Sequence, residues 1–136
     1  MLPLGPLGSS SIEAVHKGII VNVSAQTYMS MFMMPKLLTR KYRSAVINLS
    51  SKASFFTRGF MPIYCATKRY NQVLSNSMRE AYSDRVDVMT VTPSGVKTQM
   101  NPGTGPFTVQ ADDHAKSVMD HLGRYDETWG CWEHAY

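Results

Sequence analysis

The sequence predicts an α/β fold in which a short parallel sheet is covered by helices. Two apolar segments rich in β-branched residues, 45–50 and 86–92, are typical of buried strands. Segments with apolar residues at helical spacing precede, separate and follow these two strands. Because strands that alternate with helices are joined by right-handed crossovers, this order favours a parallel sheet. With 136 residues, of which 43% are hydrophobic, the chain is expected to form one domain.

The composition limits the partners and the compartment. The net charge of +4 suits an anionic nucleotide cofactor, but it is too dispersed for a nucleic-acid interface. Cys65 and Cys131 are too few for a disulfide framework, which favours an intracellular, reducing compartment: the cytoplasm, the cytosolic face of the endoplasmic reticulum or an organelle such as the mitochondrion. No apolar run approaches the roughly 18 residues of a transmembrane segment. Residues 1–11 are expected to form a flexible leader, and 12–136 the folded domain.

The first predicted element of the domain is a long helix. Ser10 and Glu13 have capping-box spacing, and apolar residues recur behind them at helical intervals. These features predict a helix from Ile12 to about Tyr42, bent or interrupted near Pro35. Four methionines cluster in this helix: Met29, Met31, Met33 and Met34. We expect them to pack in the core or between helices and not to form an adaptable binding surface.

The rest of the chain follows the same alternation of helices and strands. After the first strand come a loop (52–62), a helix on one apolar face (63–83), the second strand, a polar loop (99–108), a helix (109–122) with Gly123 as its cap, and a last strand within 128–136. The whole pattern therefore contains two or three strands and three main helices.

The candidate chemistry lies where the strands end. In parallel α/β sheets reactive groups gather beyond the carboxyl ends of the strands, and Ser50, Ser51 and the segment 93–98 follow the two predicted strands. Tyr64 and Lys68 are four residues apart at the start of a helix, which places both on one face. A neighbouring cation lowers the pKa of a phenol, so Tyr64 could exchange a proton with a substrate oxygen. Alone, the pair is equally compatible with an ordinary surface contact on a helix.

Four motifs in order resemble the short-chain dehydrogenases/reductases. Ser51 closes a strand reading INLSS, thirteen residues before the tyrosine of YCATK, and this spacing selects Ser51 over Ser50. Asn22 stands in the phrase VNV of the preceding helix. The segment PSGVKT resembles the family's Pro-Gly-x-Val-x-Thr element, with Ser94 in place of the usual glycine. Taken singly, Ser51, Asn22 and Thr98 fit a loop contact, a solvent-facing polar residue and a turn cap; their joint order favours the family.

The resemblance implies the later half of a Rossmann-type doubly wound parallel sheet and a set of residue roles. It implies that Ser51 holds the substrate oxygen, that Tyr64 is the general acid or base, and that Lys68 lowers the pKa of Tyr64 and binds the nicotinamide ribose. It further implies that Asn22 holds a water linking Lys68 to solvent. The implied cofactor is NAD or NADP, whose nicotinamide end is expected to contact Tyr64, Lys68, Pro93, Val96 and Thr98.

The end of the chain resembles one branch of this family. Thr128, Gly130 and His134 match a Thr-x-Gly followed by a histidine in 3-ketoacyl-CoA reductases and 17β-hydroxysteroid dehydrogenases of the membrane-associated type. This implies a small-molecule carbonyl or alcohol substrate of 3-ketoacyl or steroid-like chemistry. It is also compatible with peripheral membrane association.

The resemblance covers only the later half of the family's length. The sequence contains no GxxxGxG turn after a strand, the element that receives the cofactor pyrophosphate, so NAD(P) affinity is expected to be severely reduced. Three interpretations stay open: a truncated product, a missing half supplied by another chain, or a former enzyme retained as a structural subunit of a larger assembly. The family also implies a homodimer built on the helices that carry Asn22 and Tyr64.

No metal site is expected from the sequence. The four histidines, at positions 16, 114, 121 and 134, show neither HExxH nor paired Cys/His ligand spacing.

Overall fold

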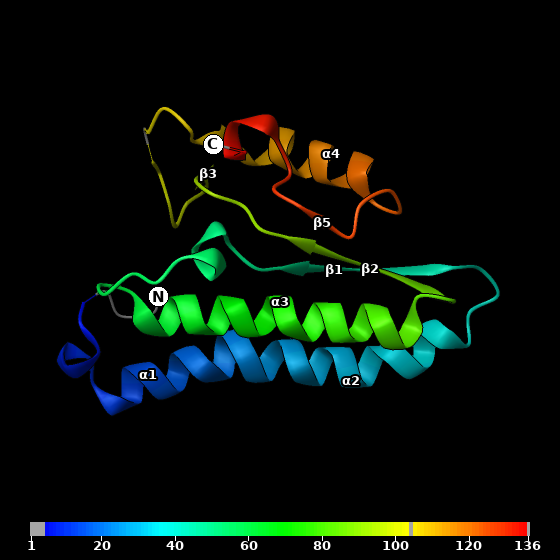
Figure 1. Cartoon of the computed structure of the whole chain (residues 1–136), viewed down its shortest axis with the longest axis horizontal. Coiled ribbons are helices and arrows are strands. Elements are labelled where there is room, and N and C mark those ends of the chain that lie inside the picture. The colour runs from blue at the N-terminus through cyan, green and yellow to red at the C-terminus, as the bar shows by residue number, and fades with distance from the viewer. Residues whose placement is uncertain (1–4, 104, 136) are drawn as a thin grey trace.

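The computed structural model describes residues 5–103 and 105–135. Its main sheet contains three parallel strands in the order β1 (Ser44–Leu49), β2 (Val86–Val91) and β5 (Glu127–Thr128). Helices cover both faces: α1 (Ile12–Ile19), α2 (Ala25–Leu38) and α3 (Pro62–Tyr82) lie on one side, and α4 (Ala111–His121) lies on the other (Figure 1). This arrangement confirms the predicted α/β fold, with three strands in the main sheet and three main helices.

The long first helix changes its helical type in the middle. It consists of α1 (Ile12–Ile19), a π-helical segment (Ile20–Ser24) and α2 (Ala25–Leu38). The helix is not interrupted near Pro35, because α2 continues through that residue, whereas a bend there stays a prediction. The predicted end near Tyr42 was also too late.

The start of the long helix differs from the prediction by one residue. Ser11, not Ser10, is the N-cap, and its hydroxyl accepts a hydrogen bond from the Ala14 amide at 3.2 Å. Ser10 instead ends a short 3-10 turn over Leu7–Ser9. This turn falls within the predicted leader, of which residues 1–4 lie outside the described residues.

The central strand of the sheet is buried on both faces. β1 and β2 pair from Ser44↔Val86 to Leu49↔Val91, and β5 pairs with the end of β2. The residues of β2 are buried except for Asp87, which is half-buried, as expected for a middle strand of a parallel sheet. β1, in contrast, pairs only with β2 within the described part of the chain, and Leu49 at its end is 58% exposed.

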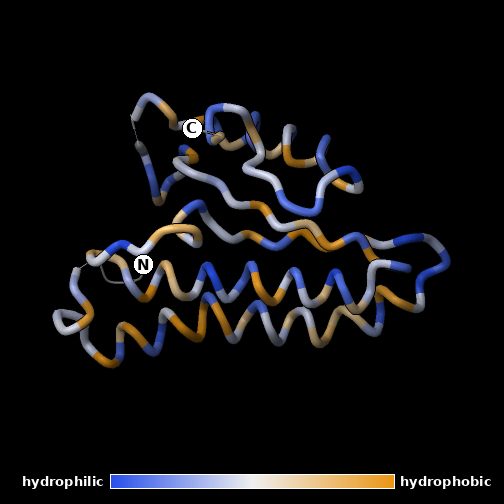
Figure 2. Tube along the Cα trace, in the orientation of Figure 1, coloured by the Kyte–Doolittle hydropathy of each residue, from blue (hydrophilic) through white to orange (hydrophobic). Residues whose placement is uncertain are grey.

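The core has one cluster on each face of the sheet. On the face covered by α2 and α3, the buried residues are Met34, Leu37, Met78, Val86 and Val88. On the face covered by α4, they are Met89, Val91 and Val118. Figure 2 shows that hydrophobic residues also follow the α1–α2 helix, where several are exposed: Val21, Met29, Met31 and Phe32 are each more than half accessible. Of the four clustered methionines only Met34 is buried, so the expected packing use is confirmed for that residue alone.

The remaining elements refine the predicted boundaries. The predicted loop at 52–62 begins with a 3-10 turn (Lys52–Phe55). α3 (Pro62–Tyr82) starts at Pro62, the last residue of the predicted loop. Two short strands, β3 (Val96–Lys97) and β4 (Val109–Gln110), pair in parallel before α4 (Ala111–His121). Gly123 has a φ of +74° just after α4, as predicted for its cap.

The last strand is much shorter than predicted. Only Glu127–Thr128 pairs with the sheet, and Trp132–His134 forms a 3-10 turn. Gly130, with a φ of +88°, turns the chain away from the sheet after β5. An added Cβ at Gly130 would overlap the His114 ring, so this close approach requires glycine.

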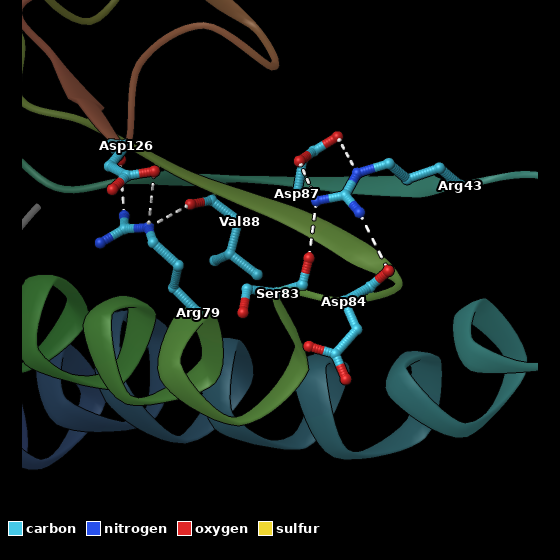
Figure 3. Close-up of polar contacts among 7 residues, drawn as sticks. All are labelled: Arg43, Arg79, Ser83, Asp84, Asp87, Val88 and Asp126. Atoms are coloured by element: carbon cyan, nitrogen blue, oxygen red, sulfur yellow. Dashed lines mark hydrogen bonds and ion pairs between the residues drawn. The ribbon is translucent and has the colours of Figure 1, made fainter.

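Two arginines make contacts at the end of the sheet where β1 and β2 begin (Figure 3). Arg43, just before β1, makes a bidentate contact to Asp87 of β2 and donates to the backbone carbonyls of Ser83 and Asp84. Arg79 of α3 donates to the Val88 carbonyl at 2.9 Å. These contacts join α3, β1 and β2 where the strands begin. The candidate site residues lie at the other end of the sheet, beyond the carboxyl ends of the strands.

Within the part of the chain that the structure describes, no helix combines the length and the apolar character needed to cross a bilayer.

Candidate active site

Two adjacent serines follow β1 and have different partners. Ser50 is buried; its hydroxyl donates to the Lys68 carbonyl at 2.6 Å, and its amide donates to the Val91 carbonyl at 2.8 Å. Ser51 is half-buried, and its hydroxyl accepts from the Ala53 amide at 3.2 Å. A hydroxyl offers one donor and two acceptor positions, so Ser51 retains its O–H donor for a ligand. Ser50, in contrast, is committed to holding the first turns of α3 against the end of β1.

Tyr64 and Lys68 lie one turn apart at the start of α3. The Lys68 Nζ atom is 5.8 Å from the centre of the Tyr64 ring, which is within cation–π range. The same ammonium donates to the Leu49 carbonyl at 3.1 Å, so it lies against the end of β1. Burial lowers the pKa of Lys68. An ammonium has three N–H donors, and only one of them is used by Leu49.

Asn22 is tied to α3 through a threonine that the sequence did not single out. The Asn22 side-chain amide donates to the Thr67 hydroxyl at 3.1 Å, and this hydroxyl donates to the Tyr64 carbonyl at 2.9 Å. Asn22 lies in the π-helical segment, and Thr67 is buried. The structure therefore connects Asn22 to the backbone of Tyr64 and shows no direct bond from it to Lys68. No local sequence pattern marks Thr67, because its partner is 45 residues away.

The segment after β2 is held by the end of the chain. The Pro93 carbonyl accepts from the Lys52 amide at 2.9 Å, which brings this segment beside the turn after Ser51. His134 is fully buried: its Nδ1 accepts from the Ser94 amide at 3.3 Å, and its Nε2 lies 3.1 Å from the Gly95 carbonyl. His134 thus orients this segment, and the match in the chain's last residues was the only signal for it.

Val96 and Thr98 lie farther along the same segment. Val96 is in β3, and the Thr98 hydroxyl accepts from the Asn101 amide at 3.1 Å, so Thr98 caps a turn and is exposed. The turn-cap interpretation therefore describes its contact in this structure. A cofactor role remains an expectation for Pro93, Val96 and Thr98.

The predicted site residues come from three elements that meet where β1 and β2 end. Ser51 follows β1, the segment 93–98 follows β2, and Tyr64 and Lys68 begin α3, at the left of Figure 1. Asn22 reaches this group from the neighbouring helix. The fold thus places the Lys68 ammonium beside the Tyr64 ring and at the carboxyl end of β1, the strand that Ser51 follows.

Comparisons with known proteins give the family. The family model described as short chain dehydrogenase matches residues 2–107. A Caenorhabditis elegans protein provisionally named steroid dehydrogenase 2 is 30% identical over 129 residues, which are 93% of this chain and 41% of that protein. A very-long-chain 3-oxoacyl-CoA reductase of Caenorhabditis briggsae is 28% identical over 90% of this chain and 40% of its own. The chain therefore spans about two fifths of the length of these curated relatives.

Solved structures agree on the fold. A short-chain dehydrogenase from Shigella flexneri complexed with NADP has a TM-score of 0.80 at 18% identity, covering 94% of this chain and 58% of its own. One from Sphingobium yanoikuyae in complex with NADPH has a TM-score of 0.78 at 21% identity, covering 89% of this chain and 50% of its own. These likenesses confirm the expected part of a Rossmann-type sheet. Together with the family match, they show that the chain belongs to the short chain dehydrogenase family.

Proposed function

We propose that this chain carries the proton-transfer site of an NAD(P)-dependent oxidoreductase that interconverts a ketone and a secondary alcohol. The observation that carries the proposal is the position of Lys68. Its ammonium lies over the Tyr64 ring and against Leu49 at the end of β1, two residues before Ser51. An ammonium beside the ring is a suitable partner for a phenol that exchanges a proton with a substrate oxygen.

The residues divide the proton chemistry among themselves. In reduction, Ser51 donates a hydrogen bond to the substrate oxygen, and Tyr64 gives its phenolic proton to that oxygen as the alcohol forms. In oxidation, the tyrosinate takes the proton from the alcohol. Lys68 stabilises the tyrosinate in both directions, and Thr67 and Asn22 hold the helix turn that carries Tyr64. The resemblance adds a water on Asn22 as the route by which the proton returns from solvent.

The residues present fit the nicotinamide end of the cofactor. Lys68 has two N–H donors beyond its bond to Leu49, and these suit the ribose hydroxyls. The backbone near Val96 and the exposed hydroxyl of Thr98 lie on the segment that His134 orients, and they would hold the carboxamide. When bound, the cofactor supplies the hydride. The sequence holds no glycine-rich turn for the pyrophosphate, so we expect weak binding by this chain alone.

The proposed substrate class follows the relatives that match most of this chain. Their names place one among steroid dehydrogenases and another among very-long-chain 3-oxoacyl-CoA reductases. We infer a 3-ketoacyl or steroid-like carbonyl compound, with NADP or NAD as cofactor. We also propose a reducing intracellular compartment, because the chain has only two cysteines. The resemblance to a membrane-associated branch is compatible with contact to a membrane surface.

The test combines cofactor binding and turnover. Purified chain is titrated with NADPH and NADH while nicotinamide fluorescence is followed, and reduction of a 3-ketoacyl thioester and a steroid ketone is assayed. Turnover that is lost in Tyr64→Phe, with an unchanged circular dichroism spectrum, is the expected result. Tyr70→Phe is the matched control, because Tyr70 lies six residues farther along α3 and its hydroxyl bonds Thr27 of α2 instead. Absence of cofactor binding up to millimolar concentration would contradict an autonomous enzyme.

A second function is favoured by the unpaired strand edge. β1 has a free edge in the described part of the chain, and exposed apolar residues follow the adjacent α1–α2 helix. Such surfaces are typical of chains that complete their fold against a partner. The alternative proposal is therefore a non-catalytic structural subunit of a larger assembly. Stable association with a partner that is unaffected by Tyr64→Phe, together with no turnover, would favour this alternative.

A further inference from the structure

A cluster of three metal-ligating side chains lies outside the proposed catalytic group. His114 comes from α4, and Cys131 and His134 come from the segment after β5. One nitrogen of each imidazole and the Cys131 sulfur lie within 4.8 Å of one another. The two rings are tilted by 46° with their centres 5.2 Å apart. Both histidines are buried and the cysteine is half-buried, so the three groups are held by the fold.

Backbone groups contact both ring nitrogens of His134. Nε2 lies 3.1 Å from the Gly95 carbonyl, which can only accept a hydrogen bond. Nδ1 lies 3.3 Å from both the Ser94 amide nitrogen and the Trp129 carbonyl oxygen. A metal bound at Nδ1 would replace these two contacts, while Nε2 would stay on the Gly95 carbonyl.

His114 has the same kind of anchor. Its Nε2 lies 3.1 Å from the Trp129 carbonyl, which can only accept, so this nitrogen donates and the other keeps its lone pair. Histidines that bind a metal nearly always donate their second ring N–H to a carbonyl or carboxylate, which fixes the ring and its tautomer. Both histidines of the cluster have this second contact already.

The cluster also borders a cavity. A cavity of about 400 Å³ is lined by two of its members, His114 and Cys131, together with Glu133 and other residues. The Glu133 carboxylate interacts with the Cys131 thiol, so an oxygen donor stands beside the sulfur. The described structure thus supplies two nitrogens and one sulfur within 4.8 Å of one another, with a carboxylate that contacts the sulfur.

We propose that His114, Cys131 and His134 bind a Zn²⁺ ion, with Glu133 or water as the fourth ligand. Zinc prefers four tetrahedral nitrogen, sulfur and oxygen ligands, and binds the cysteine as thiolate. With Zn–N of about 2.0–2.1 Å and Zn–S of about 2.3 Å, tetrahedral ligand atoms are separated by about 3.3–3.7 Å. The side chains therefore close by about 1 Å from their separation of up to 4.8 Å. The thiol proton is released to solvent on binding.

The ion would be structural. It would join α4 to the end of the chain, and through the contact of His134 Nε2 with the Gly95 carbonyl it would hold the backbone that leads into the proposed cofactor segment. The sequence prediction of no metal site rested on spacing within paired motifs. His114 lies 17 residues before Cys131, on a different element, so the fold and not the local spacing creates the set.

The test uses zinc itself with the purified chain after treatment with a chelator. Equilibrium dialysis and calorimetric titration with Zn²⁺ are expected to show one ion per chain. Cys131→Ser is expected to weaken binding at least tenfold. Cys65→Ser is the matched control, because Cys65 is the other cysteine, is buried at the start of α3 and lies outside the cluster. It should bind zinc like the unchanged protein.

A second measurement keeps the proposal testable if Cys131→Ser does not fold. In the unchanged chain, labelling of the two thiols with an alkylating reagent is followed by mass spectrometry of peptides, with and without Zn²⁺. Zinc is expected to slow labelling of Cys131 at least tenfold and leave Cys65 unaffected. Equal labelling of Cys131 in both conditions, or zinc binding by Cys131→Ser equal to that of the unchanged chain, would overturn the proposal.

Discussion

Ser50 and Ser51 are adjacent in the chain, yet their hydroxyl groups serve different parts of the structure. Ser50 is buried and donates to the Lys68 carbonyl, whereas Ser51 only accepts from the backbone of the next turn. A sequence spacing of thirteen residues to Tyr64 selected Ser51. The contacts support that selection, because the hydroxyl of Ser50 already donates its hydrogen bond to the Lys68 carbonyl.

Replacing each serine is therefore expected to affect stability and turnover differently. Ser50→Ala is expected to lower the free energy of unfolding by about 1 kcal/mol, since it removes a buried hydrogen bond. Ser51→Ala is expected to cost only about 0.5 kcal/mol, as for loss of a weak cap, and to lower kcat on the order of 100-fold. Urea unfolding and ketone turnover measure the two effects. The assignment of Ser51 is wrong if Ser50→Ala, while folded, loses more turnover than Ser51→Ala.

Lys68 predicts a pH dependence of stability. Burial lowers its folded pKa below the ordinary value of 10.5, so the folded state loses this proton before the unfolded state does. In the window between the two pKa values the unfolded state binds more protons, and stability rises with pH. Below the folded pKa both states are charged and the full cost of burying the ammonium is present.

Lys68→Met tests this directly. The variant lacks the buried charge, so it is expected to gain stability relative to the unchanged protein at pH 7 and to lose that advantage as the pH approaches 10.5. Urea midpoints at pH 7 and pH 10 give the comparison. Lys36→Met is the control for removing one exposed positive charge. An advantage that is the same at both pH values would show that the ammonium is not penalised by burial.

At the scale of elements, the sequence predicted existence and order better than geometry. The two main strands and α3 were placed within a residue or two, because apolar runs and helical periodicity are local signals. The π-helical segment at Ile20–Ser24 was not predicted, since the bond that accompanies it, from Asn22 to Thr67, joins two separate helices. Pro35 was weighted too strongly: tertiary packing of Met34 and Leu37 on the sheet accompanies a helix that local chemistry alone disfavours.

The Arg43–Asp87 contact predicts how β1 and β2 respond to acid. The hydrogen bond from Arg43 is the main cause that lowers the pKa of Asp87 below 3.8, with their charge attraction adding to it and burial opposing it. A depressed carboxyl pKa contributes stability that is present above the unfolded value of 3.8 and is lost as pH falls through the folded value. The contact therefore stabilises this edge of the sheet at neutral pH.

Arg43→Met measures that contribution. The variant is expected to unfold at lower urea concentration than the unchanged protein at pH 6, and the difference should narrow steadily below about pH 3.8. Arg124→Met, an exposed arginine near the same edge, is the matched control. Equal urea midpoints for Arg43→Met and the unchanged protein at pH 6 would show that the contact of Figure 3 contributes nothing to stability.

At the scale of the whole molecule, the chain leaves surfaces that its described part does not cover. The β1 edge is unpaired there, and apolar side chains of the α1–α2 helix face outward. Sequence reasoning anticipated both from the family resemblance, but it could not foresee the cluster of His114, Cys131 and His134. That cluster depends on how α4 and the end of the chain meet, a long-range contact that no local pattern encodes.

The outward-facing helix predicts self-association. Met31 and Phe32 are 65% and 73% exposed on α2, and burying such apolar area against a second copy is favourable by about 25 cal/mol per Å². Light scattering of the chain at tens of micromolar is therefore expected to give twice the 15.2 kDa mass of one chain. Met31→Lys combined with Phe32→Asp should reduce this to one chain, because each copy would then bury two charges.

A matched control separates this face from general stickiness. Met119→Lys combined with Phe107→Asp changes two comparably exposed apolar residues elsewhere, and it is expected to leave the mass unchanged. A monomeric unchanged chain at these concentrations would contradict the dimer and direct the search to a different partner for the apolar face. A dimer that survives the change on α2 would instead place the contact on another surface, with the unpaired β1 edge the next to test, because a free parallel-sheet edge can pair with a strand of a second chain.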